Sequence, residues 1–284
     1  YSQTWSSIGG PGSWVYSLCV YNGELIVGTT TGIAKFNGTS WSTLGTGVNG
    51  EVDALCVYNG SLYAGGRFTV AGGIPVSFIA EWNGTTWSDP EGGTDSYVVA
   101  LTVYNNKLIV GGYFTSANIP ANHVASWDGH NWAALGSGSG GTQGQVMALT
   151  VYNGDLIAAG FFSSAGGVSA SRIAKWNGTS WSALGSGINN VVYALSVYQG
   201  ELIAGGLFST AGGISANDVA KWNGSTWAAL GSGASSGFYP YVNALAVYGN
   251  DLYIGGLYTI AGGLTCNGIA KWNGSSYSQL GSGF

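Results

Sequence analysis

Charged side chains are scarce in this sequence, in which Asp, Glu, Lys and Arg make up only 7% of the residues. An average domain has about 25%. The seven Lys and Arg residues are scattered singly, and the net charge is −5. Because phosphate backbones are bound by clustered positive charge, we expect no nucleic-acid partner. Solubility must come from small polar side chains and exposed backbone, a surface that favours an extracellular or cell-surface location.

Long apolar runs are also missing from the sequence. None approaches the roughly 20 residues that a membrane-spanning helix needs, so we expect no membrane insertion. The chain begins "YSQTW", without the basic and apolar regions of a secretion signal. If the protein is secreted, we expect its signal peptide to have been removed or to lie outside this chain.

Cysteine and histidine are rare, with three and two residues respectively. Cys19 and Cys56 hold the same place in successive "LCVY" stretches, and Cys266 lies in "LTCNG". No CxxC pair and no Cys/His spacing of a zinc site is present. We therefore expect unreactive thiols, no metal and no cofactor.

Glycine and aromatic residues are abundant, and they recur in a repeated unit. Glycine accounts for 51 of the 284 residues, and twelve residues are tryptophan. Alignment on a recurring Val-Tyr pair gives steps of 37, 46, 48, 46 and 50 residues. The six tyrosines of these pairs are Tyr21, Tyr58, Tyr104, Tyr152, Tyr198 and Tyr248. The sequence therefore consists of six copies of one unit.

Each unit has four short runs typical of strands and none with helical periodicity. In the fifth copy they are "VYALSVY" (192–198), "ELIAGGLF" (201–208), "DVAKWN" (218–223) and "TWAALG" (226–231). Asn-Gly or a related pair separates the first two runs and the last two, which predicts tight hairpins. Four antiparallel strands recurring about every 46 residues are typical of a propeller blade. We predict an all-β, six-bladed β-propeller that forms a single domain over residues 1–284.

Two recurring features of the unit predict how the blades pack. The third-run tryptophan, Trp222 in the fifth copy, is interpreted as core between blades. The double glycine of the second run, Gly205 and Gly206, is expected to let such an indole lie close to the backbone.

The fourth-run pattern occurs seven times, once more than six blades need. The copies centre on Trp5, Trp41, Trp87, Trp132, Trp181, Trp227 and Tyr277. Residues 3–9 and 275–283 thus compete for one outer position. One copy is expected to close the ring, and the other to be surplus, to add an edge strand, or to dock onto a neighbouring molecule.

The stretch "VYALSVYQGELIAGGLFSTAGGISANDVAKWNGSTWAALGSG" resembles repeats of bacterial secreted and surface propellers and of the fungal cortical polarity-marker family. More distantly, its Gly-Gly followed by Trp is similar to kelch and galactose-oxidase propellers. The resemblance runs from Trp5 to Gly283 and implies a propeller that serves in display, adhesion or interaction. The copper ligands of a galactose-oxidase relative have no counterpart, since His123 and His130 are the only histidines.

Variable loops on a regular scaffold are where binding usually occurs. The loops between second and third runs, and the links between units, vary most and should lie on one face. Aromatic residues beside Asn and Asp suit a sugar, which offers an apolar face and hydroxyl groups. The candidate ligand-binding residues are Trp14, Tyr16, Asp53, Tyr97, Tyr193, Phe238, Tyr239, Tyr241 and Asn243.

We expect a non-catalytic extracellular or cell-surface binding or adhesion module that recognises glycan or a surface protein. The alternative is a structural building block of an extracellular assembly that self-associates through the surplus terminal strand. An enzyme with an axial site is a third reading, for which Asp53 with Glu51 and Asp95 are the candidate carboxylates. No GxSxG, phosphate-loop or calcium-loop motif supports catalysis.

Overall fold

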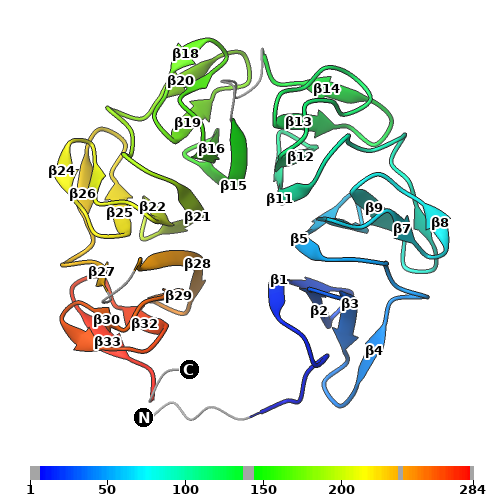
Figure 1. Ribbon diagram of the computed structural model, residues 1–284, viewed down its shortest axis with the longest axis horizontal. Coiled ribbons are helices and arrows are strands. Elements are labelled where there is room, and N and C mark those ends of the chain that lie inside the picture. Colours follow the sequence, from blue (N-terminus) through cyan, green and yellow to red (C-terminus); the bar gives the residue numbers. More distant parts are fainter. Residues whose placement is uncertain (1–6, 137–143, 236–238, 282–284) are drawn as a thin grey trace. The chain divides into compact units, whose positions relative to one another are not determined.

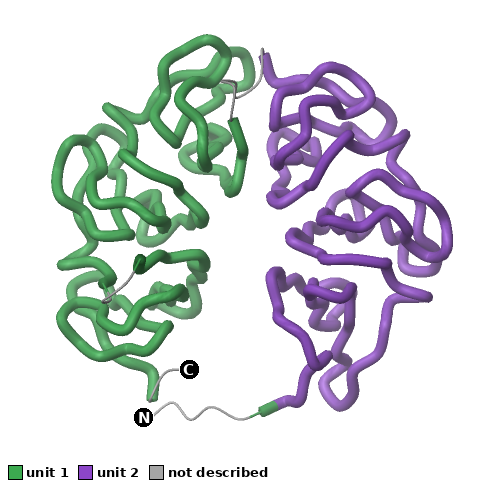
Figure 2. Tube along the Cα trace, viewed as in Figure 1, with its two compact units in different colours: residues 1–7, 140–284 green, residues 8–139 purple. Residues whose placement is uncertain are grey.

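A computed structural model describes residues 7–136, 144–235 and 239–281. Among these residues every regular element is a strand and none is a helix. The chain divides into two compact units, residues 8–139 and residues 1–7 with 140–284 (Figure 2). Six antiparallel four-stranded sheets lie in the described residues. We number them 1 to 6 in chain order.

The unit of residues 8–139 holds sheets 1, 2 and 3. Sheet 1 consists of β1 (Val15–Tyr21), β2 (Glu24–Thr29), β3 (Gly32–Phe36) and β4 (Trp41–Thr43). Sheet 2 consists of β5 (Val52–Tyr58), β6 (Ser61–Gly66), β9 (Ile79–Trp82) and β10 (Trp87–Ser88), and its loop carries β7 (Val70–Ala71) and β8 (Ile74–Pro75). Sheet 3 consists of β11 (Val98–Tyr104), β12 (Lys107–Gly112), β13 (Val124–Trp127) and β14 (Trp132–Ala134).

The other unit holds sheets 4, 5 and 6. Sheet 4 consists of β15 (Gln145–Tyr152), β16 (Asp155–Phe161), β19 (Ile173–Trp176) and β20 (Trp181–Ala183), with β17 (Ser164–Ala165) and β18 (Val168–Ser169) in its loop. Sheet 5 consists of β21 (Val192–Tyr198), β22 (Glu201–Gly206), β25 (Val219–Trp222) and β26 (Trp227–Ala229), with β23 (Thr210–Ala211) and β24 (Ile214–Ser215) in its loop. Sheet 6 consists of β28 (Tyr241–Tyr248), β29 (Asp251–Leu257), β32 (Ile269–Trp272) and β33 (Tyr277–Gln279); β27 (Ala234–Ser235), β30 (Ile260–Ala261) and β31 (Leu264–Thr265) form a ribbon beside it.

Both predicted hairpins are confirmed in the repeating unit. Asn22 and Gly23, with φ angles of 51° and 79°, turn the chain between β1 and β2. Two positive φ angles in a two-residue turn suit the right-handed twist of the strands it joins. In the second hairpin Asn37 Oδ1 accepts hydrogen bonds from the N–H groups of Thr39 and Ser40. The asparagine side chain therefore holds the turn that precedes β4.

Neighbouring sheets within a unit pack through their first strands and their tryptophans. Consecutive first strands lie side by side: β5 lies between β1 and β11, and β21 lies between β15 and β28 (Figure 1). The Tyr198 hydroxyl at the end of β21 donates to the Asn250 carbonyl of sheet 6 at 2.8 Å. The Trp227 indole of sheet 5 donates at 3.0 Å to the Leu184 carbonyl, which follows sheet 4. Trp222 lies in the same buried cluster, so its interpretation as core between sheets is confirmed.

The expectation for the double glycine is wrong. In sheet 2, a Cβ added to Gly65 would collide with the side chain of Val98, and one added to Gly66 with the carbonyl of Glu51. Neither position faces an indole, because this end of β6 is pressed between its own first strand and that of the next sheet. Glycines elsewhere do face an indole, among them Gly72 of the long loop, whose added Cβ would lie 2.8 Å from Trp87 Cβ.

The outer position of sheet 6 is filled by the carboxy-terminal copy of the fourth-run pattern. β33 pairs with β32, with Tyr277 opposite Trp272. Trp5 and most of the amino-terminal copy lie outside the described residues. The Ile8 carbonyl, at the end of that copy, accepts a hydrogen bond from the Trp41 indole at 3.0 Å. Closure of six sheets into a ring stays a prediction.

Candidate functional site

The long loop between the second and third strands is closed by one residue in the left-handed backbone region. In sheet 5 this residue is Asp218, with φ at 62°. Its N–H donates to the Phe208 carbonyl, and its carbonyl accepts from the Gly206 N–H, both at 2.9 Å. The same pair of backbone bonds recurs in five sheets. The closing residues are Phe78, His123, Arg172, Asp218 and Gly268.

This left-handed position varies in chemistry while its surroundings hardly change. It carries Phe, His, Arg, Asp or Gly, yet the following residues are always a close variant of "IAKW". A non-glycine residue in left-handed backbone costs about 1–2 kcal/mol, and a bulky one is an outlier. Gly268 shows that the fold accepts glycine here. The side chains at this position are therefore not required by the loop and mark a candidate site.

In sheet 2 a pair of carboxyl groups lies at the end of the strands that also carries the long loop. Glu51 precedes β5, Asp53 lies within it, and Arg67 follows β6. The Arg67 N–H donates to the Glu51 carbonyl at 2.8 Å, which brings the two side chains to one end of the sheet. Arg67 Nε lies 3.5 Å from Glu51 Oε1 and 3.7 Å from Asp53 Oδ2. One arginine thus faces two acids.

Burial governs the charge of Asp53. The pKa of its carboxyl is raised from 3.8 to about 7, chiefly by desolvation and also by the hydrogen bond and negative charge of Glu51, while Arg67 opposes the shift. Desolvation and the negative charges of Glu51 and Asp53 also raise the pKa of Tyr16. Two adjacent carboxyls that share an environment hold one proton more readily than they lose both. Asp53 is therefore partly protonated near neutral pH.

Aromatic rings surround Arg67. Its guanidinium carbon lies 4.9 Å from the centre of the Tyr97 ring, a cation–π contact. Tyr97 also meets the left-handed residue Phe78, at 5.5 Å between ring centres, and Tyr113, at 6.1 Å. The predicted residues Tyr16, Asp53 and Tyr97 thus belong to one polar and aromatic cluster.

Asp95 does not extend this carboxyl pair, contrary to the grouping considered for an enzyme. Its Oδ1 accepts from the N–H groups of Thr115 and Ser116, and its Oδ2 accepts from the Thr115 hydroxyl. These hydrogen bonds lower the pKa of Asp95 despite its partial desolvation. Asn49 and Asn189 make the same backbone contacts in sheets 2 and 5. The role of this position is to hold the loop.

Sheets 4 to 6 place other predicted residues together. The rings of Tyr193 and Tyr241 meet edge to face, with centres 5.8 Å apart. Asn243, two residues further along β28, is exposed. In sheet 4 the left-handed residue Arg172 lies over the Phe161 ring at 4.5 Å. Aromatic surface again stands beside polar groups at the loop end of the strands.

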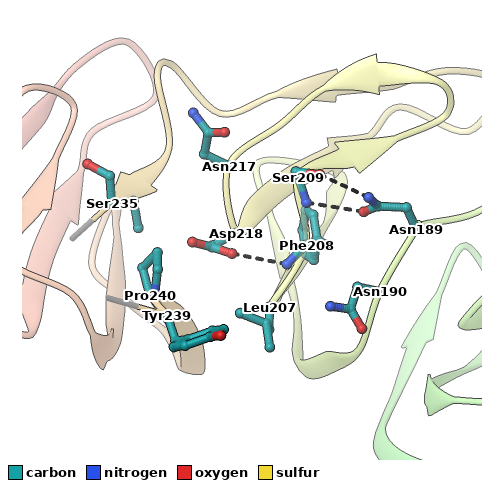
Figure 3. A pocket seen from close by; sticks show the side chains of 11 residues that line it. Asn189, Asn190, Leu207, Phe208, Ser209, Asn217, Asp218, Ser235, Tyr239 and Pro240 are labelled. Atoms are coloured by element: carbon teal, nitrogen blue, oxygen red, sulfur yellow. Dashed lines mark hydrogen bonds between the residues drawn. The ribbon is translucent and has the colours of Figure 1, made fainter. Parts of the chain in front are cut away.

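A cavity lies between the loops of sheets 5 and 6, with a volume of about 440 Å³. Asp218 lies in its wall and is only 4% exposed. One carboxylate oxygen accepts from the Phe208 N–H at 3.0 Å, and the other points away from Phe208, toward Ser235 and Pro240 (Figure 3). Tyr239 borders the mouth with its ring 80% exposed. Burial raises the pKa of Asp218 to about 6.

Two predicted residues remain to be placed. Trp14 is 78% exposed, and only its backbone carbonyl is engaged, by the Thr30 N–H at 3.0 Å. Phe238 lies outside the described residues. The sequence analysis missed Arg67 and the left-handed position. The signal for that position was present, because one variable residue stands inside a nearly constant stretch in every long-loop repeat.

Two features bear on chemistry and location. Within residues 7–136, 144–235 and 239–281, no three His, Cys, Asp or Glu side chains gather in a group that could hold a metal ion. None of these residues belongs to a helix long and apolar enough to span a membrane.

Repeated four-stranded antiparallel sheets, packed through their first strands, define a protein of the β-propeller class. Neither a protein-family model nor a curated protein matches the sequence. Among solved structures the chain is similar to the WD40 β-propeller domain of Doa1, with 15% identity, a TM-score of 0.57, and coverage of 95% of this chain and 80% of that one.

Two larger bacterial proteins show the same likeness. One is the extracellular domain of a one-component system from B. thetaiotaomicron, with 12% identity, a TM-score of 0.64 and 95% of this chain covered. The other is PorZ, a surface component of the type-IX secretion system of Porphyromonas gingivalis, with 15% identity, a TM-score of 0.60 and 96% covered. This chain spans 33% and 42% of their respective lengths. At such identities the likeness shows the fold alone.

Proposed function

We propose that the chain is a non-catalytic extracellular or cell-surface module that binds saccharide through the loop end of its sheets. The observation that carries this proposal is the left-handed position. It presents a different side chain in each of four sheets at a cost in backbone strain, while the surrounding scaffold is constant. Binding sites on repeat scaffolds are diversified in this way, with variable residues on a fixed frame.

Saccharide is the ligand class that the surrounding groups favour. Tyr239 offers an exposed ring face, and Tyr97 a partly exposed one. Amide, carboxyl and hydroxyl groups stand within the same clusters. A sugar ring needs an apolar surface to stack on and polar partners for its hydroxyls. The low charge of the whole chain agrees with a neutral or weakly charged polymer as partner, and several weak sites gain by avidity.

A broad glycan array tests the proposal. We expect saturable binding to one saccharide class that falls at least tenfold when Tyr239 and Tyr241 are both changed to Ala. The matched control is Tyr248→Ala, because Tyr248 ends the strand that Tyr241 begins and is itself 76% exposed. Equal loss in both variants, or a blank array with a folded protein, would contradict the proposal.

A second candidate function is a building block of an extracellular assembly. The Trp41–Ile8 hydrogen bond repeats the one by which the Trp87 indole binds the Leu44 carbonyl at 2.9 Å. Ile8 thus stands where the link from a preceding sheet would stand. Each described sheet already has its own outer strand, β33 in the case of sheet 6. In this candidate function the amino-terminal copy pairs with a neighbouring molecule.

A further inference from the structure

The cavity beside sheet 5 contains a carboxylate that the fold itself does not require. Phe78, His123, Arg172 and Gly268 close the equivalent loops with the same backbone bonds, so neither the carboxylate nor its charge is needed for closure. Asp218 keeps one hydrogen bond, from the Phe208 N–H, and presents its second oxygen to the cavity (Figure 3). The loop structure uses one carboxylate oxygen of Asp218, and the second oxygen has no structural partner among the described residues.

The charge of this carboxylate is not balanced nearby. The ion pairs found in the described residues use other acids, among them Glu201 with Lys221 and Asp251 with Lys271. Asp218 is more than nine-tenths buried. A buried charge is costly unless a partner of opposite charge or several hydrogen bonds compensate it. The cavity therefore suits a ligand that brings a positive group to the free oxygen.

The rest of the cavity wall suits a sugar ring. Asn190 uses its Oδ1 to accept from the Val191 N–H, and Asn217 uses its Nδ2 to donate to the Ser232 carbonyl. One amide therefore keeps donors for a ligand, and the other keeps an acceptor. Ser235 adds a hydroxyl, and the Tyr239 ring can stack on an apolar face. The volume of about 440 Å³ lies within the range of small-ligand sites, roughly 300–1,000 Å³.

We propose that the Asp218 cavity binds a saccharide unit that carries a protonated amino group, with the ammonium against the free carboxylate oxygen of Asp218. This inference rests on the proposed saccharide-binding function and assigns a ligand class to one of its sites. A charge-assisted hydrogen bond to the buried Asp218 carboxylate discriminates against a neutral substituent. Acetylation of the amine removes its positive charge and enlarges the group. Both changes should weaken the binding of N-acetylated sugars. The net charge of −5 favours the approach of cations.

Three probes of one shape test this inference: the methyl glycosides of glucosamine, N-acetylglucosamine and glucose, titrated at pH 7 by calorimetry and saturation-transfer NMR. We expect the glucosaminide to bind at least tenfold more tightly than the other two. Asp218→Asn keeps an oxygen for the Phe208 N–H but removes the charge, and should reduce glucosaminide binding to the level of the glucoside. Asp218→Gly places at this position the residue that sheet 6 has there, Gly268, and should reduce binding equally. This second variant keeps the test valid if Asp218→Asn fails to fold.

The matched control is Asp155→Asn, which removes a carboxylate paired with Lys175 in the same unit. It should leave binding unchanged. Equal binding of all three probes would overturn the amine inference and leave the saccharide function standing. Binding of none of them, with a positive glycan array, would overturn the role of this cavity. If none of the probes binds and the glycan array is also negative, the inference and the proposed function are both overturned.

Discussion

Several side chains at the loop end of the sheets cost folding free energy, through backbone strain or buried polar atoms without partners, that the fold itself does not require. Phe78, His123, Arg172 and Asp218 hold left-handed backbone where glycine would be free of strain. His123 Nδ1 and Arg172 Nε are buried and find no hydrogen-bond partner among the described residues. Unsatisfied buried polar atoms cost about 1–3 kcal/mol each. Both costs are consistent with the proposed role of this position in ligand binding.

Asp53→Asn should flatten the pH dependence of stability. Because folding raises the pKa of Asp53 from 3.8 to about 7, the folded state binds more protons than the unfolded state between those values. The free energy of unfolding therefore falls as pH rises from about 4 to 8. At about 1.4 kcal/mol per pKa unit, the loss amounts to a few kcal/mol.

Urea unfolding of both proteins at pH 4, 6 and 8 measures this effect. The variant should be the more stable protein at pH 8 and should match the wild type at pH 4. Asp155→Asn, which disrupts a partly buried ion pair with Lys175, should keep the wild-type slope. An unchanged slope in the Asp53 variant would show that this carboxyl is ionised without cost.

At the scale of elements, two recurring hydrogen bonds join neighbouring sheets. A tyrosine at the end of the first strand donates to the turn of the next sheet, as in Tyr58 to the Asn106 carbonyl at 3.0 Å and Tyr198 to the Asn250 carbonyl at 2.8 Å. On the far side a tryptophan indole donates to the preceding link, as in Trp132 to the Pro90 carbonyl at 2.9 Å. Hydrogen bonds at both ends fix the distance between sheets, and apolar side chains fill the space between them.

Tyr198→Phe removes two hydrogen bonds, the one that the hydroxyl donates to the Asn250 carbonyl and the one that it accepts from Gln199 Nε2. At about 1 kcal/mol net for each bond, it should lower the free energy of unfolding by about 1–2 kcal/mol. The comparison is Tyr248→Phe in sheet 6, whose ring is 76% exposed and whose hydroxyl has no hydrogen bond in the described part of the chain. This variant should be neutral within about 0.5 kcal/mol. Chemical denaturation measures both. A loss at Tyr248 equal to that at Tyr198 would show that the Tyr248 hydroxyl is bonded in solution.

At the scale of the whole molecule, repetition makes stability a sum over neighbouring sheets. Each sheet buries its faces against the next, as the buried clusters that span consecutive sheets show; one of them joins Tyr198 and Ile203 of sheet 5 with Leu252 and Trp272 of sheet 6. An unpaired strand edge favours pairing between molecules, which is the basis of the proposed role of the amino-terminal copy.

Deletion of residues 1–7 should leave the melting temperature within about 2 °C, since a near-neutral change shifts Tm by that much or less. It keeps Ile8 and therefore its bond to Trp41. If the amino-terminal copy joins molecules, sedimentation velocity at high concentration should show self-association in the full chain and none in the deleted one. Assembly that survives the deletion, or a marked drop in Tm, would contradict this role.

The sequence by itself determined the elements of this protein, because local chemistry is enough to specify them. Asn22 and Gly23 take up the positive φ angles of a hairpin, and the spacing of the Val-Tyr pairs set the six four-stranded sheets that the described residues contain. The burial of Trp222 between sheets also followed from its recurrence. The nine candidate ligand-binding residues remain predictions, of which the structure groups Tyr16 with Asp53 and Tyr97, and Tyr193 with Tyr241.

Only the tertiary structure decided which side chains meet, because those contacts join residues far apart in the chain. Gly65 faces Val98, not an indole, since the neighbouring sheet sets what lies beside it. Arg67 meets both Glu51 and the ring of Tyr97, a group that no local pattern contains. The left-handed backbone and burial of Asp218 are likewise set by the loop packed around it. Local propensity specifies strands and turns, whereas a site arises where separate strands bring their ends together.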